Sequence, residues 1–489
     1  MESVSRRGFL RGAATISVAG ALPGASAKAA DDVLEVAVTQ ASIATSSSGA
    51  PRPNILYIHS HDSGRFLSPY GHSADTPNLM KIATQGVLFR HAFSAAPTCS
   101  PSRAALATGQ PAHEAGMFGL VNMGFKMPSY SHHICHTLHA AGYHTVLAGL
   151  EHIAPEPEMI GFDQLLPHRS NRVADVGPAA VAFIENKPKQ PFFMDCGFFE
   201  THRSRRPGRE SGYPDNTPLD NPNFVKPPFN LPDVEATRKD IAGFNADARV
   251  LDHGVGMVMD ALAKAGLAEN TIIISTTDHG ISFPHMKCNL NDNGWGVSLI
   301  MRGPEPFRGG TVCDALVSHV DLFPTLCEYL QIEAPAWLRG KSFLPVVRGQ
   351  AKEVNDQVFA EVNYHVAYEP KRVVRTHRYK YIKRYDGRTA DVLINCDEGP
   401  SKEYWISQGW PNLPLEQAEE LYDLVFDPAE HANLAADPAH AAVLNDMRTR
   451  LVTWQKLTND PLLKGPVPLP AGARAPDANE VHQREHEHE

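Results

Sequence analysis

The chain has 489 residues, 42% of them hydrophobic and 20% charged, and a formal net charge of −10. This length excludes a single small module and favours one large or two unequal domains. The acidic balance argues against a nucleic-acid partner, which would require a basic face. No apolar run reaches the ~18 residues of a membrane span, so stable membrane insertion is not expected. Seven scattered cysteines without metal-ligand spacing exclude a zinc ribbon and a disulfide framework. A large acidic enzyme remains the favoured class.

The first residues have the features of an export signal. The segment SRRGFLR at 5–11 is a near-complete twin-arginine motif. A mildly apolar stretch at 13–22 and a small-residue cleavage site at 25–27 follow it. We therefore expect a signal peptide over 1–27 and a flexible lead-in over 28–51, with the twin-arginine translocase as a partner. This route carries folded proteins and implies a periplasmic or secreted bacterial protein.

The body of the chain alternates between strand and helix patterns. Apolar, β-branched segments predict buried strands at 54–58, 191–194 and 271–277. Helical patterns lie between them, opening at Thr76-Pro77 and spanning 247–265. Such alternation predicts an α/β fold with a mostly parallel sheet sandwiched by helices. We expect this catalytic domain to span 52–354.

The pattern changes near residue 355. Antiparallel strands are predicted at 373–376, 379–382 and 421–424, and a last helix near 439–458. These elements predict a smaller C-terminal α+β subdomain over 355–470, followed by a disordered tail over 471–489. The segment 204–233 is rich in Pro, Asn, Asp and Arg, and it is expected to form a long surface loop at the rim of a substrate site.

Acid–histidine pairs follow two of the predicted strands. They are His61-Asp62 and Asp278-His279. Ligands gather outside the carboxyl ends of parallel strands, so these four side chains could meet as metal ligands. Either pair taken alone is explained equally well as a turn after a strand.

A third element begins at Cys99. Ser100 can cap a short helix, Pro101 suits its first position and Gly109 can end it. Cys99 would then lie at a helix N-terminus, where the dipole favours a developing anion, and Arg103 one turn along could face the same site. This arrangement indicates an activated nucleophile, with a buried core cysteine as the alternative.

The pattern Cys99-x-Pro101-x-Arg103, continued by Leu106, Thr108 and Gly109, resembles the sulfatase signature, in which the cysteine is oxidised to formylglycine. The resemblance extends from Pro53 to about Pro461. Among sulfatases the chain is most similar to the N-sulfoglucosamine sulfohydrolase branch, through residues 89–93, 116–120, 152, 155–156, 202–203, 280–284, 321–325 and 420–423. The resemblance implies the alkaline-phosphatase-like fold and a formylglycine-generating enzyme as a partner.

The resemblance also implies a nucleophile and a metal. Cys99 would become the formylglycine whose hydrate attacks sulfur, and Arg103 would steady that hydrate. Asp62 and Asp278 would bind a divalent metal, calcium in the family, with Cys99 at the same centre.

Three further residues match groups that handle the sulfate and its protons. Lys287 matches the cation that binds the sulfate. His202 matches the acid that protonates the leaving group, and His152 matches the histidine that takes up a proton as sulfate is released.

Three positions depart from the family pattern. His61 stands where an aspartate is usual, His279 where an asparagine is common, and Leu150 where a lysine precedes His152 by two residues. If both imidazoles coordinate the metal, they would favour manganese, zinc or iron over calcium. The missing lysine removes one positive charge near the sulfate.

Four residues are candidate substrate contacts. Tyr364, His365 and Arg372 lie where the C-terminal subdomain lines the family's pocket, and Arg203 follows His202. For each of them a solvated surface position is an equally good interpretation.

These observations predict an exported sulfohydrolase that acts on a sulfated saccharide, with N-sulfoglucosamine residues of heparan or heparin fragments as the leading substrate. The pair Asp278-His279 motivates one alternative, a phosphonate monoester or phosphodiester hydrolase of the same superfamily. Leu150 motivates another, a non-catalytic glycan binder.

Overall fold

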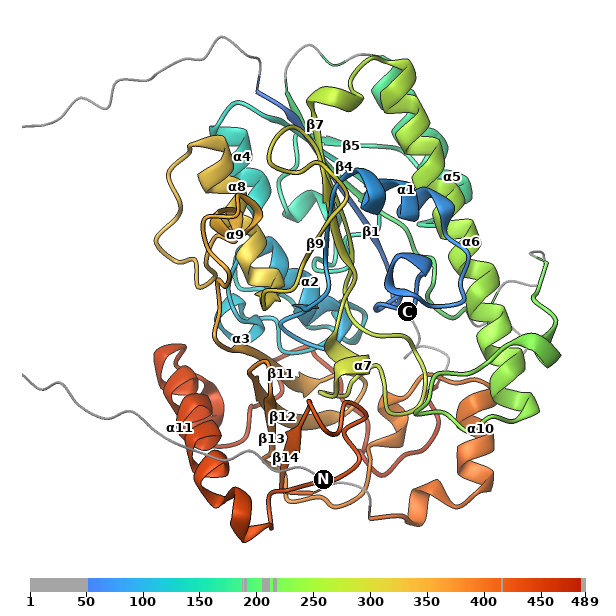
Figure 1. Cartoon of the computed structure of the whole chain (residues 1–489), viewed down its shortest axis with the longest axis vertical. Helices are drawn as coiled ribbons and strands as arrows, with labels where there is room; N and C mark the ends of the chain where they lie inside the picture. Colours follow the sequence, from blue (N-terminus) through green and yellow to red (C-terminus); the bar gives the residue numbers. More distant parts are fainter. Residues whose placement is uncertain are drawn as a thin grey trace, which may run out of the picture. The chain divides into compact units, whose positions relative to one another are not determined.

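A computed structural model describes residues 52–186, 188, 191–204, 212–213, 218–414 and 417–484 (Figure 1). The predicted signal peptide and lead-in lie outside the described residues, as do parts of the 204–233 loop and the last five residues of the chain. None of the described helices combines the length and the apolarity that crossing a bilayer requires.

The centre of the body is an eight-stranded sheet. Its strands are β1 (Asn54–Ser60), β2 (Val87–Phe89), β4 (His144–Gly149), β5 (Gln164–Leu165), β6 (Phe192–Gly197), β7 (Thr271–Thr277), β8 (Leu299–Arg302) and β9 (Thr311–Cys313). Their order is β5-β4-β6-β1-β7-β8-β2-β9. Strand β8 runs antiparallel to both of its neighbours, and the other neighbouring pairs in this sheet are parallel. The prediction of a mostly parallel sheet is therefore confirmed.

Strands β1 and β7 are hydrogen-bonded neighbours near the middle of the sheet. They pair in register from Asn54 opposite Thr271 to Ser60 opposite Thr277. Every residue of β7 is buried, as a strand covered on both faces requires. Because both strands end at the same level, the acid–histidine pairs that follow them leave the sheet side by side.

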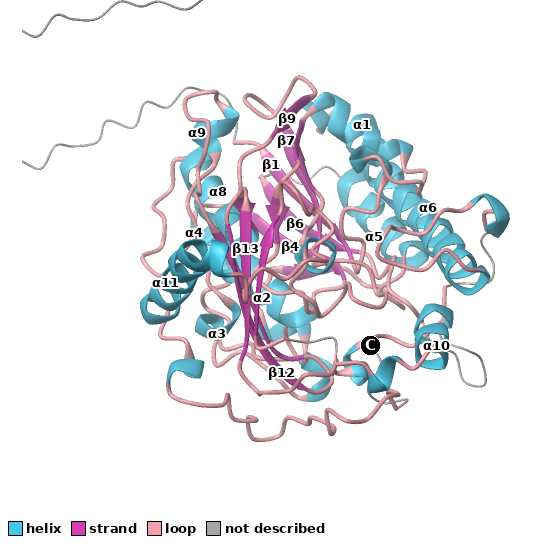
Figure 2. Ribbon diagram, turned by 60° about the horizontal axis from the view of Figure 1, so that its bottom comes forward, coloured by secondary structure: helices cyan, strands magenta, loops and turns pink. Residues whose placement is uncertain are grey.

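Helices cover both faces of the sheet (Figure 2). One layer contains α1 (Pro77–Gln85), α5 (Val173–Glu185) and α6 (Glu235–Lys264), and the other contains α2 (Cys99–Thr108), α4 (Ile134–Ala140) and α8 (Leu322–Leu330). Side chains of β7 alternate between the two layers. Ile273 packs in the core with α1, α5 and α6, whereas Ile272 and Ile274 pack in the core with α2, α4 and α8.

Helix α2 confirms the predicted helix at the cysteine motif, but it begins earlier than expected. Thr98 precedes the helix, so Cys99 is its first residue and Pro101 its third. Gly109 ends the helix with a φ of 67°. A Cβ at this position would lie 2.5 Å from the side chain of Leu338, so glycine meets both a conformational and a packing requirement.

A second, smaller sheet follows in the chain. It is antiparallel, in the order β11 (Val358–Tyr364), β12 (Tyr368–Arg375), β13 (Tyr379–Arg384) and β14 (Glu419–Asp423). Helix α11 (Ala441–Leu457) packs on it, and α10 (Pro400–Ser407) lies between β13 and β14 in the chain. The smaller C-terminal antiparallel sheet is thus confirmed.

Among the shorter elements, β3 (Ala92–Phe93) pairs with β10 (Val317–Ser318). The chain also forms the one-turn helices α3 (Ala112–Ala115), α7 (Asp292–Trp295) and α9 (Leu344–Val347) and several short 3-10 helices.

The beginning of the predicted disordered tail contacts the body. The side chain of Gln483 donates to the carbonyl oxygen of Ile394 at 2.8 Å. The backbone N–H of Arg474 donates to the carbonyl oxygen of Met123, also at 2.8 Å. These bonds give residues 471–484 a defined course along the body.

Candidate active site

The two acid–histidine pairs meet at the carboxyl ends of β1 and β7. The backbone N–H of Asp62 donates to Oδ1 of Asp278 at 2.9 Å, and Nε2 of His279 lies 3.4 Å from Oδ1 of Asp62. The ring nitrogens of His61 lie 3.3 and 3.5 Å from the carboxylates of Asp62 and Asp278. All four side chains are buried. Asp62 has a φ of 58°, a strained conformation of the kind that clusters at functional sites.

Helix α2 brings Cys99 to this group. Its Sγ lies 3.1 Å from Nε2 of His279, and the cysteine is fully buried. One potential ligand atom from each of His61, Asp62, Cys99 and Asp278 lies within 4.8 Å of the others. A ring nitrogen of His152 lies within the same distance of Cys99 and His61.

Arg103 is held in one orientation. Its guanidinium donates to Oδ2 of Asp278 at 2.9 Å, to the carbonyl oxygen of Ser60 at 3.2 Å and to Nδ1 of His59 at 2.7 Å. Because an arginine side chain can only donate, Nδ1 of His59 accepts this hydrogen bond. The Nε2–H of His59 then donates to Asp195 at 2.9 Å. Burial lowers the pKa of His59, which agrees with this neutral tautomer. Sequence reasoning missed this support, although His59 is a histidine at the end of an apolar strand.

Lys287 and His202 contact Oδ2 of Asp62, whereas His61 and His279 lie nearest to Oδ1. The Nζ of Lys287 donates to Oδ2 of Asp62 at 2.9 Å and lies 3.2 Å from Nε2 of His202. The Nδ1 of His202 lies 2.6 Å from the carbonyl oxygen of Arg203, which can only accept, so Nδ1 carries a hydrogen. The Nε2 atom of His202 therefore points toward Lys287 and Asp62.

A further carboxylate, that of Asp397, joins the site from the C-terminal part of the chain. Asp397 precedes α10, and its Oδ2 accepts a hydrogen bond from Lys287 at 3.0 Å. One of its oxygens lies within 4.8 Å of a ring nitrogen of His202 and of an Asp62 oxygen. No motif surrounds Asp397 in the sequence, and sequence reasoning missed it.

Asp62 and Asp278 differ electrostatically. Burial raises the pKa of Asp62, with Lys287, His202 and His279 only partly opposing it. Burial also acts to raise the pKa of Asp278, but the charges of His279, Arg103 and His61 outweigh it and hold that pKa well below its usual range. Asp278 is therefore the better compensated carboxylate, and Asp62 has more to gain from an additional cation.

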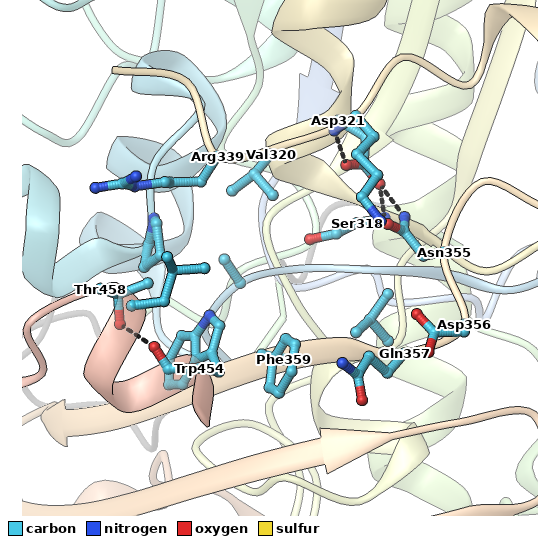
Figure 3. A pocket seen from close by; sticks show the side chains of 15 residues that line it. Ser318, Val320, Asp321, Arg339, Asn355, Asp356, Gln357, Phe359, Trp454 and Thr458 are labelled. Atoms are coloured by element: carbon cyan, nitrogen blue, oxygen red, sulfur yellow. Dashed lines mark hydrogen bonds between the residues drawn. The ribbon is translucent and has the colours of Figure 1, made fainter. Parts of the chain in front are cut away.

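A separate pocket of about 230 Å³ lies between α11 and the start of β11 (Figure 3). Its lining includes Trp454, Phe359, Asn355, Arg339 and Ser318. The Phe359 and Trp454 rings stack with their centroids 5.0 Å apart. The pocket shares no lining residue with the cluster around Cys99.

Comparisons with known proteins agree with this geometry. The family model "Sulfatase" matches residues 53–332, and the model "N-sulphoglucosamine sulphohydrolase, C-terminal" matches residues 285–407. Human N-sulphoglucosamine sulphohydrolase is 30% identical over 465 residues, which cover 84% of this chain and 92% of the human protein. The chain belongs to the sulfatase family.

Solved structures share the fold of this sulfatase. One, described as a complex with its substrate D-glucosamine-2-N,6-O-disulfate, has a TM-score of 0.66 at 18% identity and covers 84% of this chain and 98% of its own. The phosphonate monoester hydrolase of Agrobacterium radiobacter has a TM-score of 0.65 at 20% identity, with coverage of 87% and 100%. The alkaline-phosphatase-like architecture is thereby confirmed.

Sulfatases generally use a divalent metal and a formylglycine, and the residues of this sulfatase fit a metal. Oδ1 of Asp62 is buried and forms no hydrogen bond with the described residues. A buried carboxylate oxygen in that state is costly unless a cation satisfies it. The neighbouring donors are carboxylate oxygens and imidazole nitrogens, and both kinds coordinate divalent metals.

The four candidate substrate contacts occupy different surroundings. His365 is buried near Asp397, and its charge contributes to lowering the pKa of that carboxyl. Tyr364 is buried, and its hydroxyl donates to the carbonyl oxygen of Val467 at 2.8 Å. The guanidinium of Arg203 forms two hydrogen bonds with Asp240, at 2.6 and 2.9 Å. A solvated surface position, the alternative considered for each, is therefore wrong for these three residues.

Arg372 is also enclosed in the protein. It is 0% exposed and forms two hydrogen bonds with Asp460, at 2.7 and 2.8 Å. Its guanidinium also donates to the side chain of Asn363 at 2.9 Å, so this ion pair joins β12 to the segment after α11. The surface interpretation is wrong here too, because the side chain is committed to a buried partner.

The Arg372–Asp460 pair supports a stability prediction. Changing Arg372 to methionine is expected to destabilise the fold by about 3–5 kcal/mol, because Asp460 would remain as a buried carboxylate without its partner. Thermal unfolding measures this change. A direct role of Arg372 in substrate binding would instead raise KM without lowering the melting temperature, and that result would contradict the prediction.

Proposed function

We propose that this sulfatase hydrolyses sulfamate groups of N-sulfoglucosamine residues in heparan or heparin fragments through a formylglycine formed from Cys99. The observation that carries the proposal is the meeting of Cys99 with Asp62 and Asp278 on one side and the Lys287–His202 pair on the other. The similarity to human N-sulphoglucosamine sulphohydrolase over most of both chains supports the choice of substrate.

Each part of the proposed chemistry has a group in this chain. A formylglycine at position 99 would supply the attacking hydroxyl as its hydrate. The bound metal would polarise the sulfuryl oxygens and lower the pKa of that hydroxyl. The residues that would hold the metal are His61, Asp62, Asp278 and His279, together with position 99. Their two imidazoles favour manganese, zinc or iron over the calcium of the family.

The remaining residues of the site bind the sulfate and move protons. Lys287 would bind sulfate oxygens through its ammonium group, and Arg103, fixed by Asp278 and His59, would orient the hydroxyl at position 99. His202 would protonate the leaving nitrogen at Nε2, the ring atom that faces the site. This step is essential for an amine, because an unprotonated amide anion is a very poor leaving group. His152 would take up a proton during sulfate release.

The twin-arginine motif supports export of this enzyme to the periplasm or the medium. We infer that the chain meets its saccharide outside the cytoplasm. Conversion of Cys99 would require a formylglycine-generating enzyme in the producing cell.

A substrate comparison tests the proposed reaction. Protein made with a formylglycine-generating enzyme is expected to release sulfate from D-glucosamine 2-N-sulfate at least about tenfold faster, in kcat/KM, than it hydrolyses an aryl phosphodiester. A tenfold ratio corresponds to roughly 1.4 kcal/mol of differential transition-state binding. Released sulfate and phenol are measured in parallel on one preparation.

Two outcomes of this comparison would contradict the proposal. Faster turnover of the phosphodiester would favour a phosphonate or phosphate ester hydrolase, the alternative that Asp278-His279 motivates. Binding of heparin fragments without any release of sulfate, from protein with verified formylglycine, would favour a glycan binder. Leu150, a buried residue two positions before His152 where the family has a lysine, motivates that second alternative.

A further inference from the structure

The Asp397 carboxylate lies in the active site without a part in the roles proposed above. It comes from the segment between β13 and α10, far along the chain from the other site residues. Its Oδ2 accepts a hydrogen bond from Lys287 at 3.0 Å, and one of its oxygens lies within 4.8 Å of a ring nitrogen of His202. Asp397 therefore lies next to the group proposed to protonate the leaving nitrogen.

The exposure of the neighbouring side chains indicates which of them a substrate reaches first. The side chains of Asp62 and Lys287 are 0% and 1% exposed, whereas those of His202 and Asp397 retain 6% and 8%. A ring nitrogen of His202 and a carboxylate oxygen of Asp397, the two more exposed side chains, lie within 4.8 Å of each other. A leaving group that contacts His202 is therefore within reach of Asp397.

Asp397 carries a negative charge and can accept further hydrogen bonds. Burial acts to raise its pKa, but the positive charges of Lys287, His202 and His365 outweigh burial, and the net shift is downward. An ionised carboxylate has about four lone-pair sites, so the bond from Lys287 leaves acceptor capacity unused.

We propose that Asp397 selects N-linked over O-linked sulfate by accepting a hydrogen bond from the N–H of the sulfamate group. This inference rests on the proposed function and adds a specificity-determining residue to it. A sulfamate nitrogen carries one hydrogen that the carboxylate can accept. The bridging oxygen of a sulfate ester carries none, and its lone pairs would face the negative charge of Asp397.

The balance of the reaction adds to this preference. The N–S bond breaks, the oxygen of water ends on sulfur as sulfate, and the nitrogen gains two protons and leaves as an ammonium group. That cation forms beside Asp397, which stabilises the positive charge as it develops. An ester releases a neutral hydroxyl group and gains nothing from the same carboxylate.

The test compares two sulfated forms of one sugar. We would measure kcat/KM for sulfate release from D-glucosamine 2-N-sulfate and from D-glucosamine 6-O-sulfate with wild type, Asp397→Asn and Glu398→Gln. Asp397→Asn is expected to lower the N-sulfate value about 10- to 100-fold more than the 6-O-sulfate value, the range of a hydrogen bond to a charged group. Glu398→Gln makes the same chemical change one residue along, at a carboxylate that pairs with Lys402 at 2.6 Å, and should leave the ratio unchanged.

Asp397→Asn also removes a partner of Lys287, which could lower both rates by a common factor. An equal fall with both substrates, or no fall, would mean that Asp397 only positions Lys287, and it would overturn the proposal. A binding measurement gives an independent readout. Glucosamine, the cationic product, should inhibit the wild type more strongly than glucose, and this difference should disappear in Asp397→Asn. A persistent difference would also overturn the proposal.

The substrate preference of the wild-type enzyme shows whether the proposed function itself fails. If wild-type enzyme releases the 6-O-sulfate but not the N-sulfate, the proposed substrate is wrong and the selection by Asp397 falls with it. If the wild type prefers the N-sulfate and Asp397→Asn keeps that preference, the inference about Asp397 alone is wrong.

Discussion

Replacing Cys99 by alanine is expected to reduce sulfate release by at least about 10³-fold, because the variant has no group at position 99 that can be converted into the nucleophile. The side chain is small and buried, and alanine is a good helix former, so the fold should remain. Sulfate release and thermal unfolding are measured on the same preparation. Cys135→Ala, which changes another buried cysteine outside the site, is the matched control and should keep its activity.

Mass spectrometry of the peptide from His91 to Arg103 completes this experiment. Active wild-type protein should carry an aldehyde at position 99 that reacts with a hydrazide. A Cys99→Ala variant with full activity, or an active wild type that carries only the free thiol, would contradict the proposed nucleophile.

Asp62→Asn is expected to cause the second large loss, through the metal. Asparagine has no negative charge, and its amide oxygen is a weaker metal ligand than a carboxylate oxygen. Losing a residue that only hydrogen-bonds to a ligand lowers metal affinity roughly 10- to 100-fold, and losing a ligand should lower it by more. Asparagine also tolerates the φ of 58° at this position better than most residues, so the backbone should keep its course. Elemental analysis after dialysis measures the metal content and identifies the metal, and sulfate release follows activity.

The control for this variant is Asp314→Asn, which removes an exposed carboxylate paired with Arg90 and should retain the metal. Calcium as the bound element would contradict coordination by the two imidazoles. An Asp62→Asn protein with undiminished metal content would show that Asp62 is not a ligand.

The central sheet and the nucleophile motif could be predicted from sequence because local patterns encode them. The β-branched run at 271–277 has the composition of a buried strand, and the strand forms there. The helix at Cys99 was predicted with a start at Pro101, yet the first turn begins at Cys99 itself. Proline fits any position of a first turn, so its presence does not fix the boundary.

The residues that hold the site residues and the C-terminal sheet in position could not be predicted, because their contacts join distant parts of the chain. Asp397 meets Lys287 across 110 positions, and Arg372 meets Asp460 across 88. For Arg372 and Arg203 the sequence left a solvated surface position as an equally good interpretation, because neither residue has a carboxylate partner nearby in a recognisable motif. Only the packed structure shows that each guanidinium has a buried carboxylate as its partner.

The burial of Cys99 has a consequence for the order of events in the cell. Its side chain is 0% exposed, on a helix packed between the sheet and neighbouring helices, so a modifying enzyme cannot reach it once the chain has folded. The proposed oxidation must therefore come first, while the segment around Cys99 is still extended. Since the twin-arginine route carries folded proteins, maturation would then be finished in the cytoplasm. A molecule that folds too early would keep its thiol and remain inactive for its lifetime.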